Sequence, residues 1–238
     1  MSFRPPRALL LDLDDTILAY APLADPLWER VTTAFAPGLG IAPSALLDAI
    51  RRAGRLYWGE PERSRAGRHD MRGARRSICL WAFRELGLPE LAGAALADAF
   101  HDAREAAVEP LPGALDALEQ FRSRGLPLAL VTNGGSELQR RKVERFGLAG
   151  FFEEILIEGE LGYGKPDLRV FGQALLAVGA PAEEVWMVGD NLHADVAGAQ
   201  SSGITGVWVD AEERGIPQGI DVAPDHRIRG LAELIDRL

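Results

Sequence analysis

The sequence predicts an α/β fold in which a doubly wound parallel sheet is interrupted by an inserted, all-helical block. Short apolar runs alternate with helical patterns over the C-terminal half, an arrangement typical of a parallel sheet with helices on both faces. Another apolar run near the N-terminus indicates a further buried strand. Residues 17–108, between these regions, have helical spacing and no convincing strand. A helical block inside an alternating pattern favours an inserted domain.

The apolar runs and the glycine and proline clusters between them give the expected elements in order. Strands are expected at residues 8–13, 127–132, 154–157, 185–188 and 206–209. Helices of the inserted block are expected at residues 25–35, 43–58, 68–86 and 91–107. Those of the remaining chain are expected at residues 112–124, 136–146, 167–178, 194–202 and 231–237. A hinge at residues 109–113 would return the chain to the sheet, so we expect one domain of residues 1–17 plus 109–238 and another of residues 18–108.

Composition restricts the function classes. The 238 residues carry a net charge of −9, which argues against general nucleic-acid binding because that needs a basic surface. No apolar run approaches the ~20 residues of a membrane span, and Asp12 interrupts the only stretch that could resemble a signal peptide. Cys79 is the single cysteine, so no internal disulfide can form. We therefore expect a cytoplasmic protein with no nucleic-acid or membrane partner.

Two carboxylates lie at the carboxyl end of the first expected strand. Side chains on a strand alternate between its faces, so Asp12 and Asp14 point the same way. Like charges side by side are costly unless a cation, a shared proton or phosphate chemistry uses them. Thr16 then begins a polar exit from the strand. The alternative interpretation is a strand end with capping acids.

Ligands in open parallel sheets bind beyond the carboxyl ends of the strands, and a polar loop follows the strand at 127–132. Thr132, Asn133 and Gly134 combine a hydroxyl with free N–H groups ahead of a helix, which suits a phosphate oxyanion. Ser136 and Gln139 have the spacing of a capping box for that helix. A plain strand–turn–helix connection is the alternative.

Two further clusters follow the later strands. Lys165 precedes Pro166, which holds it out of the next helix, because the residue before proline disfavours the α region. Asp190 and Asp195 follow the strand at 185–188, and their oxygens are of the kind that Mg²⁺ prefers. Asp195 alone could instead be a helix N-cap.

Taken in order, these four stretches resemble motifs I to IV of the haloacid dehalogenase-like (HAD) hydrolase superfamily. The resemblance covers roughly residues 8–17 and 111–210 and implies a Rossmann-like catalytic core. The helical insert between motifs I and II is similar to the cap domain of subfamily I. The matching residues are Asp12, Asp14 and Thr16, then Thr132, then Gly164 to Asp167, and finally Gly189, Asp190 and Asp195.

The resemblance implies a Mg²⁺-dependent phosphatase acting on small phosphate monoesters such as sugar phosphates or nucleotide-like metabolites. Asp12 would attack phosphorus to form an aspartyl-phosphate, and Asp14 would protonate the leaving oxygen and then activate water. Thr132 and Lys165 would hold the phosphoryl oxygens as charge shifts.

Further residues complete this implied site. Mg²⁺ would be held by Asp12, the backbone carbonyl of Asp14 and Asp190, with Asp195 orienting Lys165 or a metal-bound water. The resemblance also places residues that follow the first two strands near the phosphate. These are Thr16, Asn133 and Gly134.

Within the superfamily, Asp14 favours phosphoryl transfer, because the haloacid dehalogenases lack this second aspartate and need no metal. A phosphosugar mutase keeps both aspartates and stays an alternative. A phospho-accepting signalling domain is disfavoured, since such domains have about half this length and no helical cap. The partner would then be a small phosphorylated molecule, bound by a monomer or homodimer.

The inserted block carries a candidate substrate contact. Four arginines at residues 68, 72, 75 and 76 have the spacing of one helix face. Arg68 and Arg72 are candidates to meet the anionic end of the substrate. The alternative is a solvated face, which is the usual state of charged helix faces.

Overall fold

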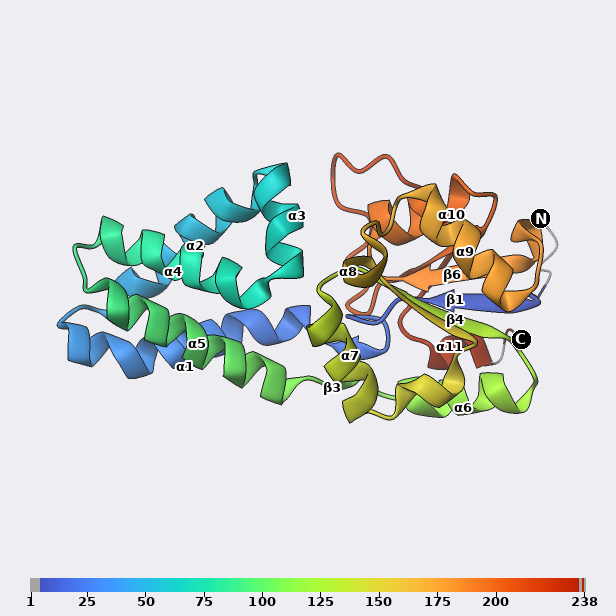
Figure 1. Cartoon of the computed structure of the whole chain (residues 1–238), viewed down its shortest axis with the longest axis horizontal. Helices are drawn as coiled ribbons and strands as arrows, with labels where there is room; N and C mark the ends of the chain where they lie inside the picture. The colour runs from blue at the N-terminus through green and yellow to red at the C-terminus, as the bar shows by residue number, and fades with distance from the viewer. Residues whose placement is uncertain (1–4, 236, 238) are drawn as a thin grey trace. The chain divides into compact units, whose positions relative to one another are not determined.

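The computed structural model describes residues 5–235 and residue 237 (Figure 1). The chain divides into two compact units, Met1–Ala19 with Glu109–Leu238, and Tyr20–Val108. The chain leaves and re-enters the first unit through a short antiparallel pair, β2 (Leu18–Ala19) and β3 (Glu109–Pro110). Because β2 pairs with β3, residues 18 and 19 belong to the first unit.

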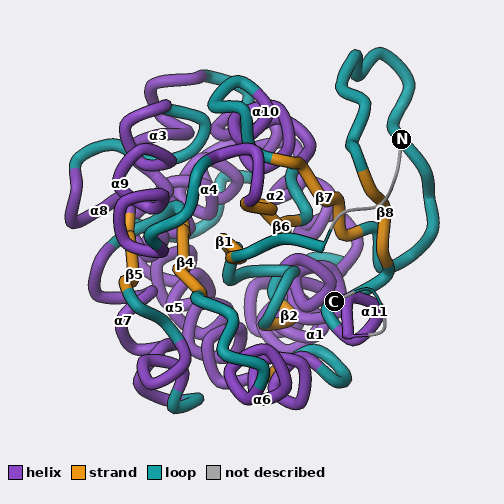
Figure 2. Tube along the Cα trace, turned by 90° about the vertical axis from the view of Figure 1, so that its right-hand side faces the viewer, coloured by secondary structure: helices purple, strands orange, loops and turns teal. Residues whose placement is uncertain are grey.

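The first unit is built on a six-stranded parallel sheet with the order β5-β4-β1-β6-β7-β8, which Figure 2 shows nearly end-on. All four side chains of the central strand β1 are buried, as its position between β4 and β6 requires. The predicted α/β class is therefore confirmed. The strands are β1 (Ala8–Leu11), β4 (Leu128–Thr132), β5 (Glu154–Ile157), β6 (Val185–Gly189), β7 (Thr205–Val209) and β8 (His226–Ile228).

Helices cover both faces of this sheet, with α9 and α10 on one side and α6 and α11 on the other (Figure 1). On the α9 side, Phe171 packs with Leu10, Val131 and Met187 of three neighbouring strands in one buried cluster. The helices are α6 (Ala114–Ser123), α7 (Ser136–Arg145), α8 (Glu158–Leu161), α9 (Leu168–Val178), the π-helical turn η4 (Leu192–Ala197), α10 (Gly198–Gln200) and α11 (Ala232–Ile235). Short 3₁₀ turns, η2 (Leu148–Phe151) and η3 (Ala182–Glu184), precede β5 and β6.

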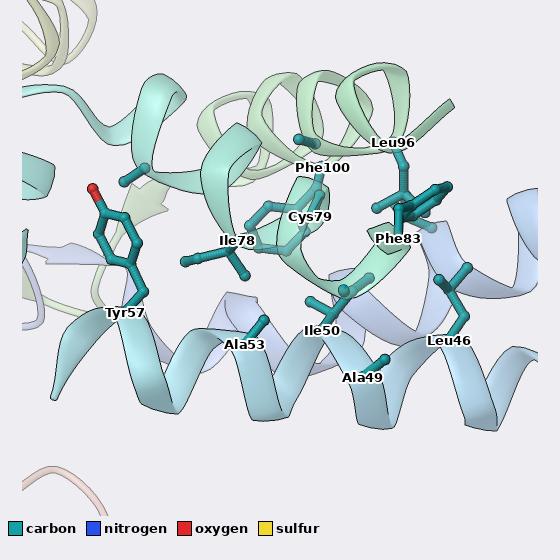
Figure 3. Packing of buried hydrophobic residues seen from close by; sticks show 14 of the residues in the cluster. Leu46, Ala49, Ile50, Ala53, Tyr57, Ile78, Cys79, Phe83, Leu96 and Phe100 are labelled. Carbon is teal, nitrogen blue, oxygen red and sulfur yellow. The ribbon is translucent and has the colours of Figure 1, made fainter. Parts of the chain in front are cut away.

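In the second unit, where every residue is described, the elements of regular secondary structure are all helices. Apolar side chains from its helices meet in one core, where Ile50, Ile78, Phe83 and Phe100 are nearly or fully buried (Figure 3). No single described helix is long and apolar enough to cross a membrane; α1, with the turn before it, and α2 pass that test only as a pair bent by 119°. The elements are η1 (Ala21–Leu23), α1 (Ala24–Leu39), α2 (Pro43–Trp58), α3 (Pro61–His69), α4 (Met71–Glu85) and α5 (Glu90–Ala107).

The single helix expected over residues 68–86 is wrong. Asp70 ends α3 and caps α4, since its carboxylate accepts a hydrogen bond of 2.8 Å from the Gly73 N–H. Arg68 therefore belongs to α3, and Arg72 to α4. The four arginines do not share one helix face.

Candidate active site

The carboxyl ends of the central strands bring three distant residues of the first unit together. The Asp12 N–H donates to the Val188 carbonyl at 3.0 Å, so the parallel pairing of β1 and β6 extends to Asp12 itself. The Lys165 Nζ lies 2.5 Å from Asp12 Oδ1 and 2.7 Å from Asp195 Oδ1. All three side chains are buried. Sequence reasoning proposed each of them, and the structure places them in direct contact.

Asp190 joins this group. Carboxylate oxygens of Asp12, Asp190 and Asp195 lie within 4.8 Å of one another, close enough to share one metal ion. Asp195 is held by the Asn191 N–H, which donates to its Oδ2 at 2.9 Å. Within the described part of the chain, no hydrogen bond or ion pair reaches the Asp190 carboxylate. That carboxylate is therefore available to a cation.

Charge in this cluster is unbalanced, because one ammonium group faces three carboxylates. The pKa of Asp12 is raised to about 7, chiefly by burial, while Lys165 opposes this rise and the neighbouring Asp195 contributes to it. Burial likewise raises the pKa of Asp190 to about 8, with Asp12 as the next cause. Burial alone would lower the pKa of Lys165, but Asp12 and Asp195 outweigh it and raise that pKa. A divalent cation with oxygen ligands fits this excess of buried negative charge.

Asp14 has a different set of partners. The Lys142 Nζ contacts both of its carboxylate oxygens, at 2.7 and 2.8 Å, and the Gln139 Nε2 donates to Oδ2 at 3.0 Å. Gln139 Nε2 also donates to Thr132 Oγ1 at 2.6 Å. The expected capping box of Ser136 and Gln139 is therefore wrong, since Gln139 turns inward and α7 begins without a side-chain cap.

Lys142 is a site residue that sequence reasoning missed. Gln139, Lys142 and Val143 are the buried residues of α7 and have the spacing of one helix face. That spacing is the signal that could have found Lys142, because a polar pair on the buried face of a helix needs buried partners.

Asn133 supports the loop that carries Lys165, whereas Gly134 contacts the helix α8. The Asn133 side chain donates to the Lys165 carbonyl at 2.7 Å and accepts from the Lys165 N–H at 2.8 Å. The Gly134 N–H donates at 3.1 Å to Glu158, a buried carboxylate that sequence reasoning also missed. The contacts found for these groups are with Lys165 and with Glu158 of α8, so their expected phosphate contacts stay a prediction.

Thr16 is fully buried, and its hydroxyl has no hydrogen-bond partner among the described residues. Its contact with phosphate likewise stays a prediction.

The expected cap arginines have partners within the helical unit. Arg72 pairs with Asp98 at 2.9 Å and with Asp102 at 2.5 Å. The Arg68 Nη1 lies 3.5 Å from the Ser64 hydroxyl. Their contact with substrate stays a prediction.

Arg75 does not lie on a solvated face, because its side chain is only 3% exposed. It donates to the Tyr20 hydroxyl at 2.7 Å and lies 2.5 Å from His101 Nδ1. Within the helical unit, Arg75 therefore belongs to a buried polar network.

Comparison with known proteins decides the family. Residues 6–203 match the model of the haloacid dehalogenase-like hydrolases. The chain belongs to this family. Across 96% of its length it is 40% identical to a phosphoserine phosphatase of Thermus thermophilus, 97% of which is covered. The family and the phosphatase-like branch predicted from the sequence are therefore confirmed.

Solved structures of HAD hydrolases agree with the fold. The magnesium-bound HAD hydrolase YfnB of Bacillus subtilis superposes with a TM-score of 0.74 at 25% identity, with 98% of each chain covered. A 2-haloacid dehalogenase of Pseudomonas syringae superposes with a TM-score of 0.61 at 29% identity, covering 97% of this chain and 96% of the other. Because similar proteins include both a phosphatase and a dehalogenase, the reaction has to be argued from the site.

Proposed function

We propose that this protein is a Mg²⁺-dependent phosphatase that hydrolyses small phosphate monoesters through an aspartyl-phosphate on Asp12. The observation that carries the proposal is a second carboxylate, Asp14, which follows the buried Asp12 and is held by Lys142. A phosphatase needs such a group, because an alkoxide leaving group has to be protonated. Dehalogenation, in which halide leaves, has no such requirement.

The reaction has two displacements at phosphorus. An oxygen of Asp12 attacks, the ester P–O bond breaks, and the proton of Asp14 goes to the leaving oxygen. Water then attacks phosphorus and gives its proton to Asp14, and the Asp12–phosphorus bond breaks to release inorganic phosphate. Thr132 and Lys165 would hold the phosphoryl oxygens during both steps.

Asp12, Asp190 and the backbone carbonyl of Asp14 would hold the Mg²⁺. When bound, the ion would neutralise the charge of the carboxylates and the phosphate. The donor set supports this assignment, because the Asp190 carboxylate has no hydrogen bond or ion pair from the described chain. Asp195 would support the metal site by fixing Lys165, since its two oxygens already contact Lys165 Nζ and the Asn191 N–H.

The helical unit would serve as the cap that selects the substrate. Arg68 or Arg72 would contact the anionic end of that substrate. The Thermus relative makes phosphoserine the first substrate to test. We also propose a cytoplasmic location, which is supported by the single cysteine, Cys79, since one cysteine allows no internal disulfide.

The deciding experiment measures phosphate release from p-nitrophenyl phosphate, phosphoserine and a panel of sugar phosphates and nucleoside monophosphates. Wild type should release phosphate with Mg²⁺ and lose the activity in excess EDTA, and Asp12→Asn should be inactive. No release from any ester with Mg²⁺, or full release by Asp12→Asn, would overturn the proposal. Isomerised phosphosugar without free phosphate would identify the mutase alternative instead.

A further inference from the structure

Lys142, on α7, contacts the carboxylate proposed to carry the proton. We propose that Lys142 is a positioning residue for Asp14, holding its carboxylate in the orientation from which it protonates the leaving oxygen. The inference rests on the proposed phosphatase function and adds to it a residue outside the four motif stretches.

The geometry of the contact supports a positioning role. The Lys142 ammonium group reaches both oxygens of Asp14, at 2.7 and 2.8 Å, so it restricts rotation of the carboxylate. Its side chain is 5% exposed, whereas that of Asp14 is 24% exposed. The pair is therefore fixed from its buried side and open to solvent on the side of Asp14.

A second contact links this pair to Thr132, the residue proposed to hold the phosphoryl group. Gln139, on the same buried face of α7, donates to Asp14 at 3.0 Å and to the Thr132 hydroxyl at 2.6 Å. One helix therefore orients both the proton donor and the hydroxyl proposed to hold the phosphoryl group. Displacement of a reacting group by about 1 Å can cost 10²-fold in rate.

The two buried lysines serve different carboxylates. Lys165 contacts Asp12 and Asp195, while Lys142 contacts Asp14. Loss of Lys142 should therefore affect the proton transfer of Asp14 and leave the attack by Asp12 largely intact. Because of this separation, an experiment can distinguish the proposed positioning role of Lys142 from a general structural role.

The test compares phenyl phosphate with p-nitrophenyl phosphate in Lys142→Met. The two esters have similar shapes, but phenol is a much weaker acid than p-nitrophenol, so its departure depends more on protonation. We expect kcat/KM for phenyl phosphate to fall about tenfold more than kcat/KM for p-nitrophenyl phosphate, within the range that general acid catalysis contributes. The ratio kcat/KM is used because it reports on steps up to the first phosphoryl transfer.

Two further variants serve as a positive comparison and as a control. Asp14→Asn should change the ratio of the two esters in the same direction and by more. Arg141→Gln is the matched control, because Arg141 neighbours Lys142 on α7 but has a side chain that is 60% exposed and paired with Glu137. It should leave the ratio within twofold of wild type.

Folding losses cannot imitate the expected result, since both esters are assayed in one sample and their ratio does not depend on the fraction of active protein. Equal losses on both esters in Lys142→Met would overturn the inference while leaving the phosphatase function intact. Failure of the wild type to release phosphate from these two esters and from every ester of the panel would instead overturn the proposed function.

Discussion

Replacing Asp12, the proposed nucleophile, by Asn should abolish turnover and yet stabilise the metal-free protein. The side chain of Asp12 is 10% exposed, and its carboxylate lies close to those of Asp190 and Asp195. The ammonium group of Lys165 contacts the Asp12 carboxylate and also that of Asp195. Asn keeps the size of the side chain and removes one buried negative charge from this group.

The magnitude follows from the pKa of Asp12, which is raised from 3.8 to about 7 in the folded protein. Between these two values the folded state binds more protons than the unfolded state, so stability falls as the pH rises. With about 1.36 kcal/mol for each pKa unit, the ionised carboxylate costs the folded state about 4 kcal/mol at pH 8 and less than about 2 kcal/mol at pH 5. The stabilisation of Asp12→Asn should follow the same trend.

The assay is urea unfolding of wild type and Asp12→Asn in EDTA at pH 5 and pH 8. The variant should be more stable at both, with a gain larger by about 2 kcal/mol at pH 8. Saturating Mg²⁺ should narrow the difference, because an ion bound to Asp12 stabilises only the wild type strongly, by about 2.7 kcal/mol at 100 times its Kd. A less stable variant in EDTA, or a gain that shrinks with rising pH, would refute the reasoning.

Three further predictions concern other groups. Lys165→Met should lower kcat by about 10²–10³-fold and destabilise the protein by about 3–5 kcal/mol, because it leaves Asp12 and Asp195 without their cation; steady-state kinetics and urea unfolding measure both. Gly189→Ala should lower activity even where the protein folds, because the added Cβ would lie 2.2 Å from Asp195 Oδ2; comparing its kcat with its circular dichroism separates the two effects. Burial, and then Arg75, lower the pKa of His101 from 6.5, so the unfolded state binds more protons below pH 6.5. The free energy of unfolding of wild type should therefore fall as the pH drops below 6.5, and it should fall more than that of His101→Gln. Unfolding measured at several pH values checks this difference.

The sheet and the residues at its strand ends could be predicted because both depend on short-range patterns. Apolar runs of four or five residues mark the strands. Thr132 is the last residue of its strand, and Asp12 and Asp190 each follow the last residue of theirs. Parallel pairing then places these ends at one edge, whatever the separation along the chain. Strand β8 (His226–Ile228) escaped prediction, because an edge strand of three residues with two polar side chains has no such pattern.

Two of the errors arise where a contact distant in sequence decides a side chain's direction. Gln139 has the spacing of a capping residue, but its actual acceptors include Asp14, 125 positions earlier. Arg75 has the pattern of an exposed helix face, but it bonds with the hydroxyl of Tyr20, 55 positions earlier. A local motif predicts a contact between residues close in sequence. That prediction is wrong when the side chain bonds instead to a buried partner distant in sequence.

The site separates two carboxylates that are two residues apart in sequence. The Asp12 side chain is 10% exposed and contacts Lys165, as suits a nucleophile that has to lose its water before it attacks. The Asp14 side chain is 24% exposed and contacts Lys142, as suits an acid that has to take its proton back from water in each cycle. Two environments for two carboxylates are what a two-step displacement requires. Because Lys165 contacts the proposed nucleophile and Lys142 the proposed acid, replacing Lys165 should impair the attack on phosphorus, whereas replacing Lys142 should impair proton transfer.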